Sequence, residues 1–203
     1  AATLTNDLGE KAAIYKAATE KFTDCPRAFN NLGHVYLQQG KVADAKAAFQ
    51  AAKALKDNAS VQANLGAVAL AEGDLKTAEE MLTAAMSAGD APSYNLGIIK
   101  IKQGDYAAAV NYFGNKPSFN AALAQLLNGN NDKAIATLNE LGDVKDGWVY
   151  YLKAVANARG GVADGVVTNL REAITRDPSI KAYAAKDAEL LKFIENEAVK
   201  ALL

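Results

Sequence analysis

The sequence is poor in the residues that most often carry chemistry or form cross-links. Its 203 residues include one cysteine, Cys25, and one histidine, His34. A single cysteine excludes an intrachain disulfide, and a single histidine leaves neither a His pair nor a His-rich set of zinc ligands. We therefore expect no enzyme active site, no metal and no cofactor. Cys25, which precedes Pro26 at an expected helix start, is interpreted as a partly buried small residue.

An excess of one charge and long apolar runs are also missing. The chain has 22 basic and 23 acidic residues and a net charge of −1, so it lacks the basic surface on which nucleic-acid binding depends. No apolar run approaches the roughly 18 residues of a membrane-spanning helix. Residues 1–24 show no basic start followed by an apolar core, so we expect no signal peptide in this chain. Half of the residues are hydrophobic, which is enough for a packed core.

What the sequence contains instead is an internal repeat. Three segments share the same tripeptide: Asn31-Leu32-Gly33, Asn64-Leu65-Gly66 and Asn95-Leu96-Gly97. The glycines are 33 and then 31 residues apart. Periods of this length are typical of helical solenoids, in which stacked helix pairs build an extended surface that binds other chains.

Each repeat is predicted to form two helices joined by a glycine turn. The first helix of the first repeat has apolar residues at i, i+3, i+4 and i+7, at Phe29, Leu32, Gly33 and Tyr36. A second stripe follows the turn at Gly40, at Ala45, Ala48, Phe49 and Ala52. Glycine inside a helix costs about 1 kcal/mol relative to alanine. Its recurrence in the Leu-Gly motif therefore indicates a close approach between the two helices.

The remaining repeats are more degenerate. Helix pairs are expected at residues 118–128 with 132–141 and at 148–159 with 166–176. Only 25 residues separate Gly104 from Gly129, so the second helix of the third repeat must end early, near Gly114. Residues 128–132 lack the closing glutamate of a calcium loop, and they are interpreted as a turn between helices.

Both ends of the chain are predicted to be helical as well. Residues 7–22 have the pattern of the second helix of a repeat whose first helix is absent, which favours a piece of a longer protein. Residues 179–203 are expected to form two helical segments with a polar outer face. Such a segment caps the last apolar edge of a solenoid.

This pattern resembles the tetratricopeptide repeat (TPR) family. The family has Leu-Gly at its seventh and eighth places, aromatic residues at the eleventh and twenty-fourth, and alanine at the twentieth and twenty-seventh. Tyr36, Phe49 and the alanines Ala45 and Ala52 match in the first repeat. The resemblance implies an all-α fold, a TPR-like α-solenoid of antiparallel helix pairs stacked into a right-handed superhelix. Residues 1–203 would form one domain, with a partial repeat at 7–25, about five repeats over 26–178 and capping helices at 179–203.

The resemblance also implies where a ligand would bind. In this family the first helices line the concave surface, and some members use asparagines at the sixth place to bond the backbone of an extended peptide, since an amide both donates and accepts. The asparagines at that place are Asn31, Asn64, Asn95 and Asn120. Other residues implied to line the groove are His34, Tyr94, Ile98, Lys102 and Phe119. Alternatively, the asparagines bond to a neighbouring repeat or are merely tolerated polar residues.

The expected function is a non-enzymatic scaffold that binds an extended peptide or partner segment in its concave groove. The chaperone-type carboxylate clamp of the family needs lysine and then asparagine at the fifth and ninth places of the first repeat, where this chain has Asn30 and His34. Binding of acidic C-terminal tails is therefore not expected. The alternative is a structural module of a larger, possibly envelope-associated protein, with no peptide ligand of its own. The compartment (cytoplasm or bacterial envelope and periplasm) and the oligomeric state stay open.

Overall fold

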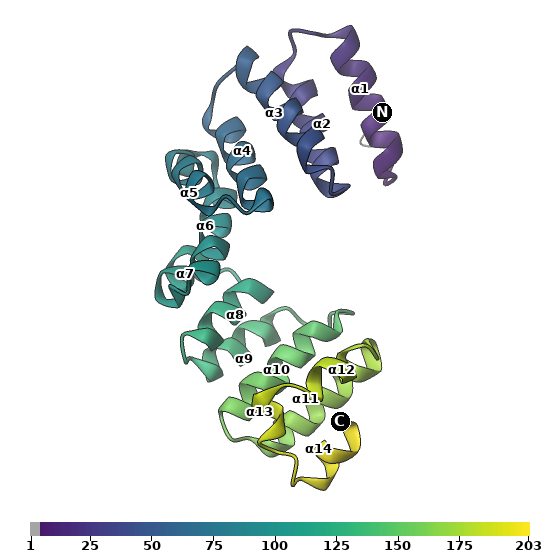
Figure 1. The fold of residues 1–203 in the computed structure, drawn as a ribbon, viewed down its shortest axis with the longest axis vertical. Coiled ribbons are helices and arrows are strands. Elements are labelled where there is room, and N and C mark those ends of the chain that lie inside the picture. Colours follow the sequence, from purple (N-terminus) through teal and green to yellow (C-terminus); the bar gives the residue numbers. More distant parts are fainter. Residues whose placement is uncertain (1–4) are drawn as a thin grey trace. The chain divides into compact units, whose positions relative to one another are not determined.

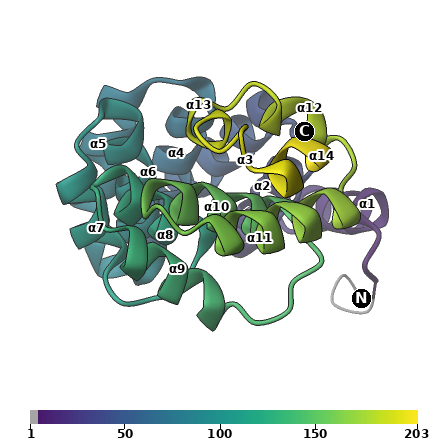
Figure 2. The ribbon, with the colours of Figure 1, turned by 90° about the horizontal axis from the view of Figure 1, so that it is seen from below.

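The computed structural model describes residues 5–203, and within them the regular structure is α-helical, with no strand (Figures 1 and 2). This confirms the predicted all-α solenoid of antiparallel helix pairs. The chain divides into two compact units, of which the first ends at Ile99 and the second comprises Lys100–Leu203. We call them unit 1 and unit 2 and describe each by itself.

Unit 1 is built from successive helix pairs. Its elements are α1 (Leu8–Lys21), α2 (Pro26–Gln38), α3 (Val42–Leu55), α4 (Ala59–Glu72), α5 (Leu75–Ala84), the 3-10 helix η2 (Met86–Ala88) and the first part of α6 (Asp90–Gln103). Helix α2 pairs with α3 and α4 with α5, while α1 packs against α2 and α3 against α4. Pro26 opens α2, where a missing N–H costs nothing. Asn58 caps α4 by accepting a 3.0 Å bond from the N–H of Val61.

Unit 2 continues the same arrangement with shorter and more varied helices. After the end of α6 come α7 (Tyr106–Phe113), α8 (Phe119–Leu127), α9 (Asn131–Glu140), α10 (Gly147–Arg159), α11 (Ala163–Arg176), α12 (Ile180–Ala184), α13 (Ala188–Leu191) and α14 (Glu197–Leu202). As predicted, α7 ends at Gly114, which adopts φ 60° and ψ −138°, a combination that residues with a Cβ avoid.

The C-terminal region differs from the prediction, because it contains three short helices instead of two segments. Asp187 accepts bonds from the N–H groups of Glu189 and Leu190, and Asn196 does the same for the start of α14. Each of these side chains satisfies donors at the start of a helix, so the chain breaks and restarts a helix twice. The segment still covers the last pair, since α13 packs on α10 and α14 on α11.

The glycines of the Leu-Gly motif have the packing role expected of them. A Cβ placed on Gly33 would lie 2.6 Å from a ring carbon of Phe49, and one on Gly66 would lie 2.7 Å from Cγ of Leu82. Phe49 and Leu82 come from the second helix of the same pair, and both are fully buried. Glycine therefore lets a large side chain of α3 or α5 lie directly against the backbone of α2 or α4.

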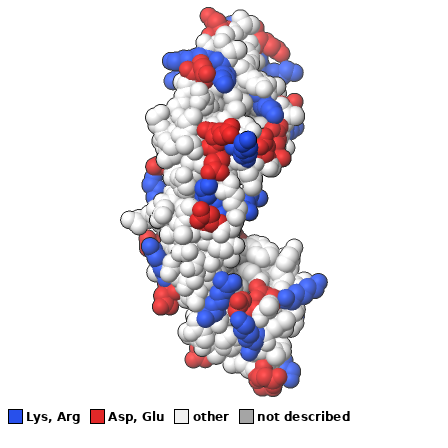
Figure 3. Space-filling view, turned by 60° about the vertical axis from the view of Figure 1, so that its left-hand side comes forward, with Lys and Arg blue, Asp and Glu red and all other residues white. Residues whose placement is uncertain are grey.

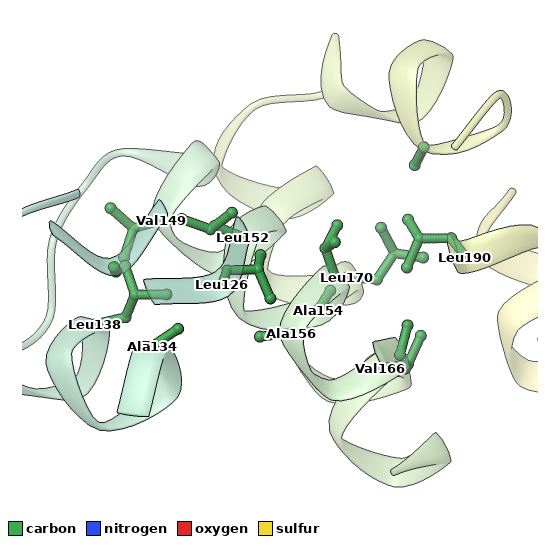
Figure 4. Packing of buried hydrophobic residues seen from close by; sticks show 14 of the residues in the cluster. Leu126, Ala134, Leu138, Val149, Leu152, Ala154, Ala156, Val166, Leu170 and Leu190 are labelled. Carbon is green, nitrogen blue, oxygen red and sulfur yellow. The ribbon is translucent and has the colours of Figure 1, made fainter. Parts of the chain in front are cut away.

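The core of unit 2 is an apolar cluster, and one charged side chain, that of Lys153, is also buried in this unit. Side chains from α8, α9, α10, α11 and the C-terminal segment converge there (Figure 4). In the fifth repeat, Lys153 and Ala154 occupy the place of Leu-Gly. Lys153 is only 8% exposed, and its ammonium lies 4.9 Å from the ring centroid of Tyr150. Burial and the nearby charge of Arg176 lower the pKa of Lys153.

This buried lysine predicts a pH dependence of stability. Because its pKa is lower in the folded than in the unfolded chain, the folded protein holds fewer protons between that pKa and the unfolded value of about 10.4. Stability therefore rises with pH in this window. We expect the free energy of unfolding of wild type, measured by urea denaturation, to increase relative to that of Lys153→Met as the pH rises from neutral towards the pKa of lysine in the unfolded chain. Lys145→Met, at an exposed lysine of the same unit, is the control, and a difference that stays constant with pH would contradict the assignment.

Candidate peptide-binding groove

The predicted groove residues of unit 1 lie where the first helices of consecutive repeats meet. Helices α2 and α4 contact each other directly. Across this contact, Nδ2 of Asn64 donates a 2.7 Å hydrogen bond to Oδ1 of Asn30. Both side chains are half-buried. This bond leaves the amide nitrogen of Asn30 as a donor and the amide oxygen of Asn64 as an acceptor, side by side on one surface.

Asn31 and His34 lie on α2 beside this pair in sequence. Asn31 is half-buried, and its side chain has no hydrogen-bond partner among residues 5–203. His34 is exposed, but one edge of its ring packs on Phe49, with centroids 5.3 Å apart and ring planes at 81°. Partial burial of the ring disfavours the charged imidazolium and lowers the pKa of His34 below its ordinary value. The neutral imidazole is therefore the favoured form at neutral pH.

The predicted residues of the third repeat lie on α6. Asn95 and Ile98 are half-buried, and Tyr94 is 40% exposed. Lys102, on the part of α6 that belongs to unit 2, is exposed. Tyr94 thus presents a large aromatic surface to solvent, as a peptide anchor requires.

The other two predicted residues, Phe119 and Asn120, begin α8 in unit 2. Asn120 is half-buried, and Phe119 packs against the apolar cluster of that unit. Much of the ring of Phe119 is therefore used in holding the core together, which weakens its prediction as an anchor. The groove in unit 1 is the better defined part of the candidate site.

A basic cavity opens at the start of α2 and α4, next to the Asn30–Asn64 pair. Its volume is about 670 Å³. Its polar lining consists of Arg27, Asn30, Lys56, Asn58, Ser60 and Ser87. Arg27 and Lys56 are both exposed, and no carboxylate belongs to the described residues that line the cavity. The cavity therefore favours an acidic group, in a chain whose overall charge is close to zero.

These two basic residues were missed by sequence reasoning. Arg27 stands at the second place of its repeat, one turn before the asparagines, and Ser60 occupies the same place in the next repeat. The repeat register could thus have identified Arg27 as a groove residue. Lys56 lies in the connection between α3 and α4, where the period carries no information about which side chains meet.

Other kinds of site have little support in the described structure. Nowhere in residues 5–203 do three or more His, Cys, Asp or Glu side chains lie close enough together to hold a metal. Basic and acidic side chains are interspersed on the face shown in Figure 3. Among the described helices, none combines the length and hydropathy needed to cross a membrane. Cys25 is half-buried, as expected.

Comparisons with solved structures place this fold among solenoids built of helix pairs. The chain aligns over 98% of its length with a chain of the APC/C hetero-tetramer Cut9–Hcn1, at TM-score 0.78 and 18% identity, and spans 40% of that chain. It aligns over 89% of its length with Pseudomonas aeruginosa pilF, at TM-score 0.70 and 16% identity, and covers 90% of that chain. YrrB, described as a TPR protein with an unusual peptide-binding site, aligns over 82% of this chain and 94% of its own, at TM-score 0.59 and 20% identity.

A family model gives the more specific result. The model of a tetratricopeptide repeat matches residues 10–60 and again residues 31–93. No curated protein matches the sequence significantly. The matched segments contain the first two of the three Leu-Gly motifs, and the solved structures show the same fold over the remaining helices. Residues 10–93 therefore carry tetratricopeptide repeats, and the chain has the fold of that family, which is the fold of protein–protein interaction scaffolds and implies protein partners.

Proposed function

We propose that this protein is a non-enzymatic scaffold that binds an extended, acidic segment of a partner protein along α2, α4 and α6 of unit 1. The observation that supports this most directly is the Asn30–Asn64 pair. It offers one free donor and one free acceptor on the surface where α2 and α4 meet. A peptide backbone presents the complementary acceptor and donor at every residue.

Residues near the Asn30–Asn64 pair would supply further affinity and the sequence selectivity that backbone contacts lack. Asn31 and Asn95 repeat the amide function along the surface, and Tyr94 offers an exposed aromatic ring. Backbone contacts do not distinguish one peptide sequence from another. Arg27 and Lys56 give the cavity at the start of α2 and α4 a preference for a carboxylate. YrrB, which shares this fold, is described as having a peptide-binding site.

The expected affinity is moderate. A hydrogen bond contributes about 0.5–1.5 kcal/mol net, so three or four amide contacts supply roughly 2–6 kcal/mol before ordering costs. A buried aromatic contact and one ion pair would bring the total to micromolar affinity, about −8 kcal/mol.

The test is a fluorescence-polarisation screen of labelled extended octapeptides in acidic and neutral versions. We expect the double variant Asn31→Ala/Asn64→Ala to weaken both versions about tenfold, the equivalent of one or two lost hydrogen bonds. The double variant Arg27→Gln/Lys56→Gln should weaken only the acidic peptides, because it removes charge and leaves the amides in place. Raising the salt concentration should reduce the difference between the two versions.

The matched control is Gln50→Ala, at an exposed position of the second helix α3. It should bind every peptide like wild type. All variants are compared at equal helix content and thermal midpoint, since Asn64→Ala also removes a bond between α2 and α4. Binding that survives both double variants would reject the groove. No binding by wild type to any peptide would leave the Asn30–Asn64 bond as a structural contact and favour the alternative of a module without a peptide ligand.

A further inference from the structure

The polar groups that line the basic cavity at the start of α2 and α4 are mainly hydrogen-bond donors. Asn30 and Asn58 both line it. Oδ1 of Asn30 accepts the 2.7 Å bond from Asn64, and Oδ1 of Asn58 accepts the 3.0 Å bond from the N–H of Val61. These bonds occupy the oxygen of each amide and leave its nitrogen to donate to a ligand. The hydroxyl of Ser60 is a further donor in the lining.

The charge of this lining is entirely positive. Arg27 and Lys56 are exposed, and neither forms an ion pair within residues 5–203. Asp57 follows Lys56 in the sequence but does not line the cavity. It accepts a 3.1 Å hydrogen bond from Nε2 of Gln62 and lies 3.9 Å from Nζ of Lys53. A ligand in the cavity therefore meets two positive charges and no carboxylate among the described lining residues.

These features favour a phosphate monoester over a carboxylate. A phosphate monoester carries a charge of about −1.5 to −2 at neutral pH and three strong acceptor oxygens, so one group balances both Arg27 and Lys56. A carboxylate satisfies the site only in part, because its single charge leaves one of the two cations unbalanced. The planar guanidinium of Arg27 suits bidentate contact with phosphate oxygens. The cavity volume of about 670 Å³ has room for the larger group.

We propose that this cavity binds the phosphate group of a phosphorylated serine or threonine in the partner segment. The inference rests on the proposed function and names the acidic group of the segment. Asn30 connects the two sites, since it lines the cavity and also belongs to the Asn30–Asn64 pair. The phosphate therefore lies within one short side chain of the bound backbone, which selects phosphoserine or phosphothreonine over phosphotyrosine. Phosphorylation of the partner then controls its binding.

The proposal is tested on the full chain by fluorescence polarisation with labelled octapeptides that differ at one residue. That residue is phosphoserine, phosphotyrosine, glutamate or serine. We expect the phosphoserine peptide to bind at least about tenfold more tightly than the glutamate peptide, the equivalent of one additional charge-assisted hydrogen bond. The phosphotyrosine peptide should bind more weakly than the phosphoserine peptide. Equal affinities of the phosphoserine and glutamate peptides would overturn the proposal and leave the groove in place.

Variants at exposed positions connect this preference to the cavity. Arg27→Lys keeps the charge and removes the planar fork, so it should weaken the phosphoserine peptide about tenfold and leave the serine peptide unchanged. Lys56→Gln should have the same selective effect. Lys16→Gln, at an exposed lysine of α1 that does not line the cavity, is the control and should bind like wild type. Wild-type affinity of both cavity variants for the phosphoserine peptide would reject the assignment.

A small probe separates failure of this proposal from failure of the groove. In ¹H–¹⁵N NMR titrations, N-acetyl-O-phosphoserine amide should cause saturable shifts of the backbone N–H groups of Arg27, Ala59 and Ser60, which line the cavity. Such shifts, weakened in Lys56→Gln, would support the phosphate site even if no octapeptide bound, and the groove alone would then be rejected. Absence of saturable shifts would overturn the proposal. So would tighter binding to vesicles of phosphatidylcholine and phosphatidic acid than to the phosphoserine peptide.

Discussion

Replacing Phe49 with alanine is expected to lower the free energy of unfolding by about 3–5 kcal/mol. Phe49 is fully buried in the core of unit 1, where it packs against Gly33 and His34. Helix α2 presents a glycine at this contact, so no side chain on that residue is able to move into the space that the ring leaves. The free energy lost through the unfilled cavity should therefore add in full to the free energy lost through reduced apolar burial.

Urea denaturation followed by far-ultraviolet circular dichroism measures this effect. Gln50→Ala, one residue further along α3 and exposed, is the control and should stay within about 0.5 kcal/mol of wild type. A loss below about 1 kcal/mol for Phe49→Ala would mean that the α2–α3 contact is looser than the structure shows.

Replacing Gly66 with valine is expected to cost about 1–3 kcal/mol or more through overpacking. Its Cβ would lie 2.7 Å from Cγ of Leu82 and 3.3 Å from Cβ of Met81. Both neighbours are atoms close to the backbone of α5 and not the far ends of flexible side chains. Helices α4 and α5 must therefore move apart to admit the new side chain.

A double-mutant cycle identifies the cause of this loss. Leu82→Ala alone should cost about 2–5 kcal/mol, and the double variant Gly66→Val/Leu82→Ala should cost less than the sum, by roughly 0.5–3 kcal/mol. Ala71→Val, at an exposed position of the same helix, controls for the helix propensity of valine and should cost no more than about 0.7 kcal/mol. Strict additivity in the cycle would show that Gly66 and Leu82 do not share the contact.

The candidate groove in unit 1 and the cavity of about 300 Å³ between the end of α7 and helices α8 and α9 in unit 2 differ in their origin. The candidate groove follows from repetition, because the same place in each repeat lies on the same face of each first helix. The cavity follows from a departure from repetition, since α7 ends early and Gln125 replaces the aromatic residue of the first repeat. Features of the first kind could be predicted from the period, and those of the second kind could be predicted only as far as the early end at Gly114.

Sequence by itself determined the helix pairs, the turns and the residues that form the close contacts. These properties are local or strictly periodic, so the Leu-Gly motif, the alanine stripe and the spacing from Gly104 to Gly129 were sufficient. Only the tertiary structure decided that Asn64 bonds to Asn30, that Arg27 and Lys56 border one cavity and that Gln125 is buried and accepts a hydrogen bond from Thr137. Such contacts join residues of different helices through side-chain rotamers and connecting segments. A period in the sequence specifies which face a residue occupies, but not which partner it meets there.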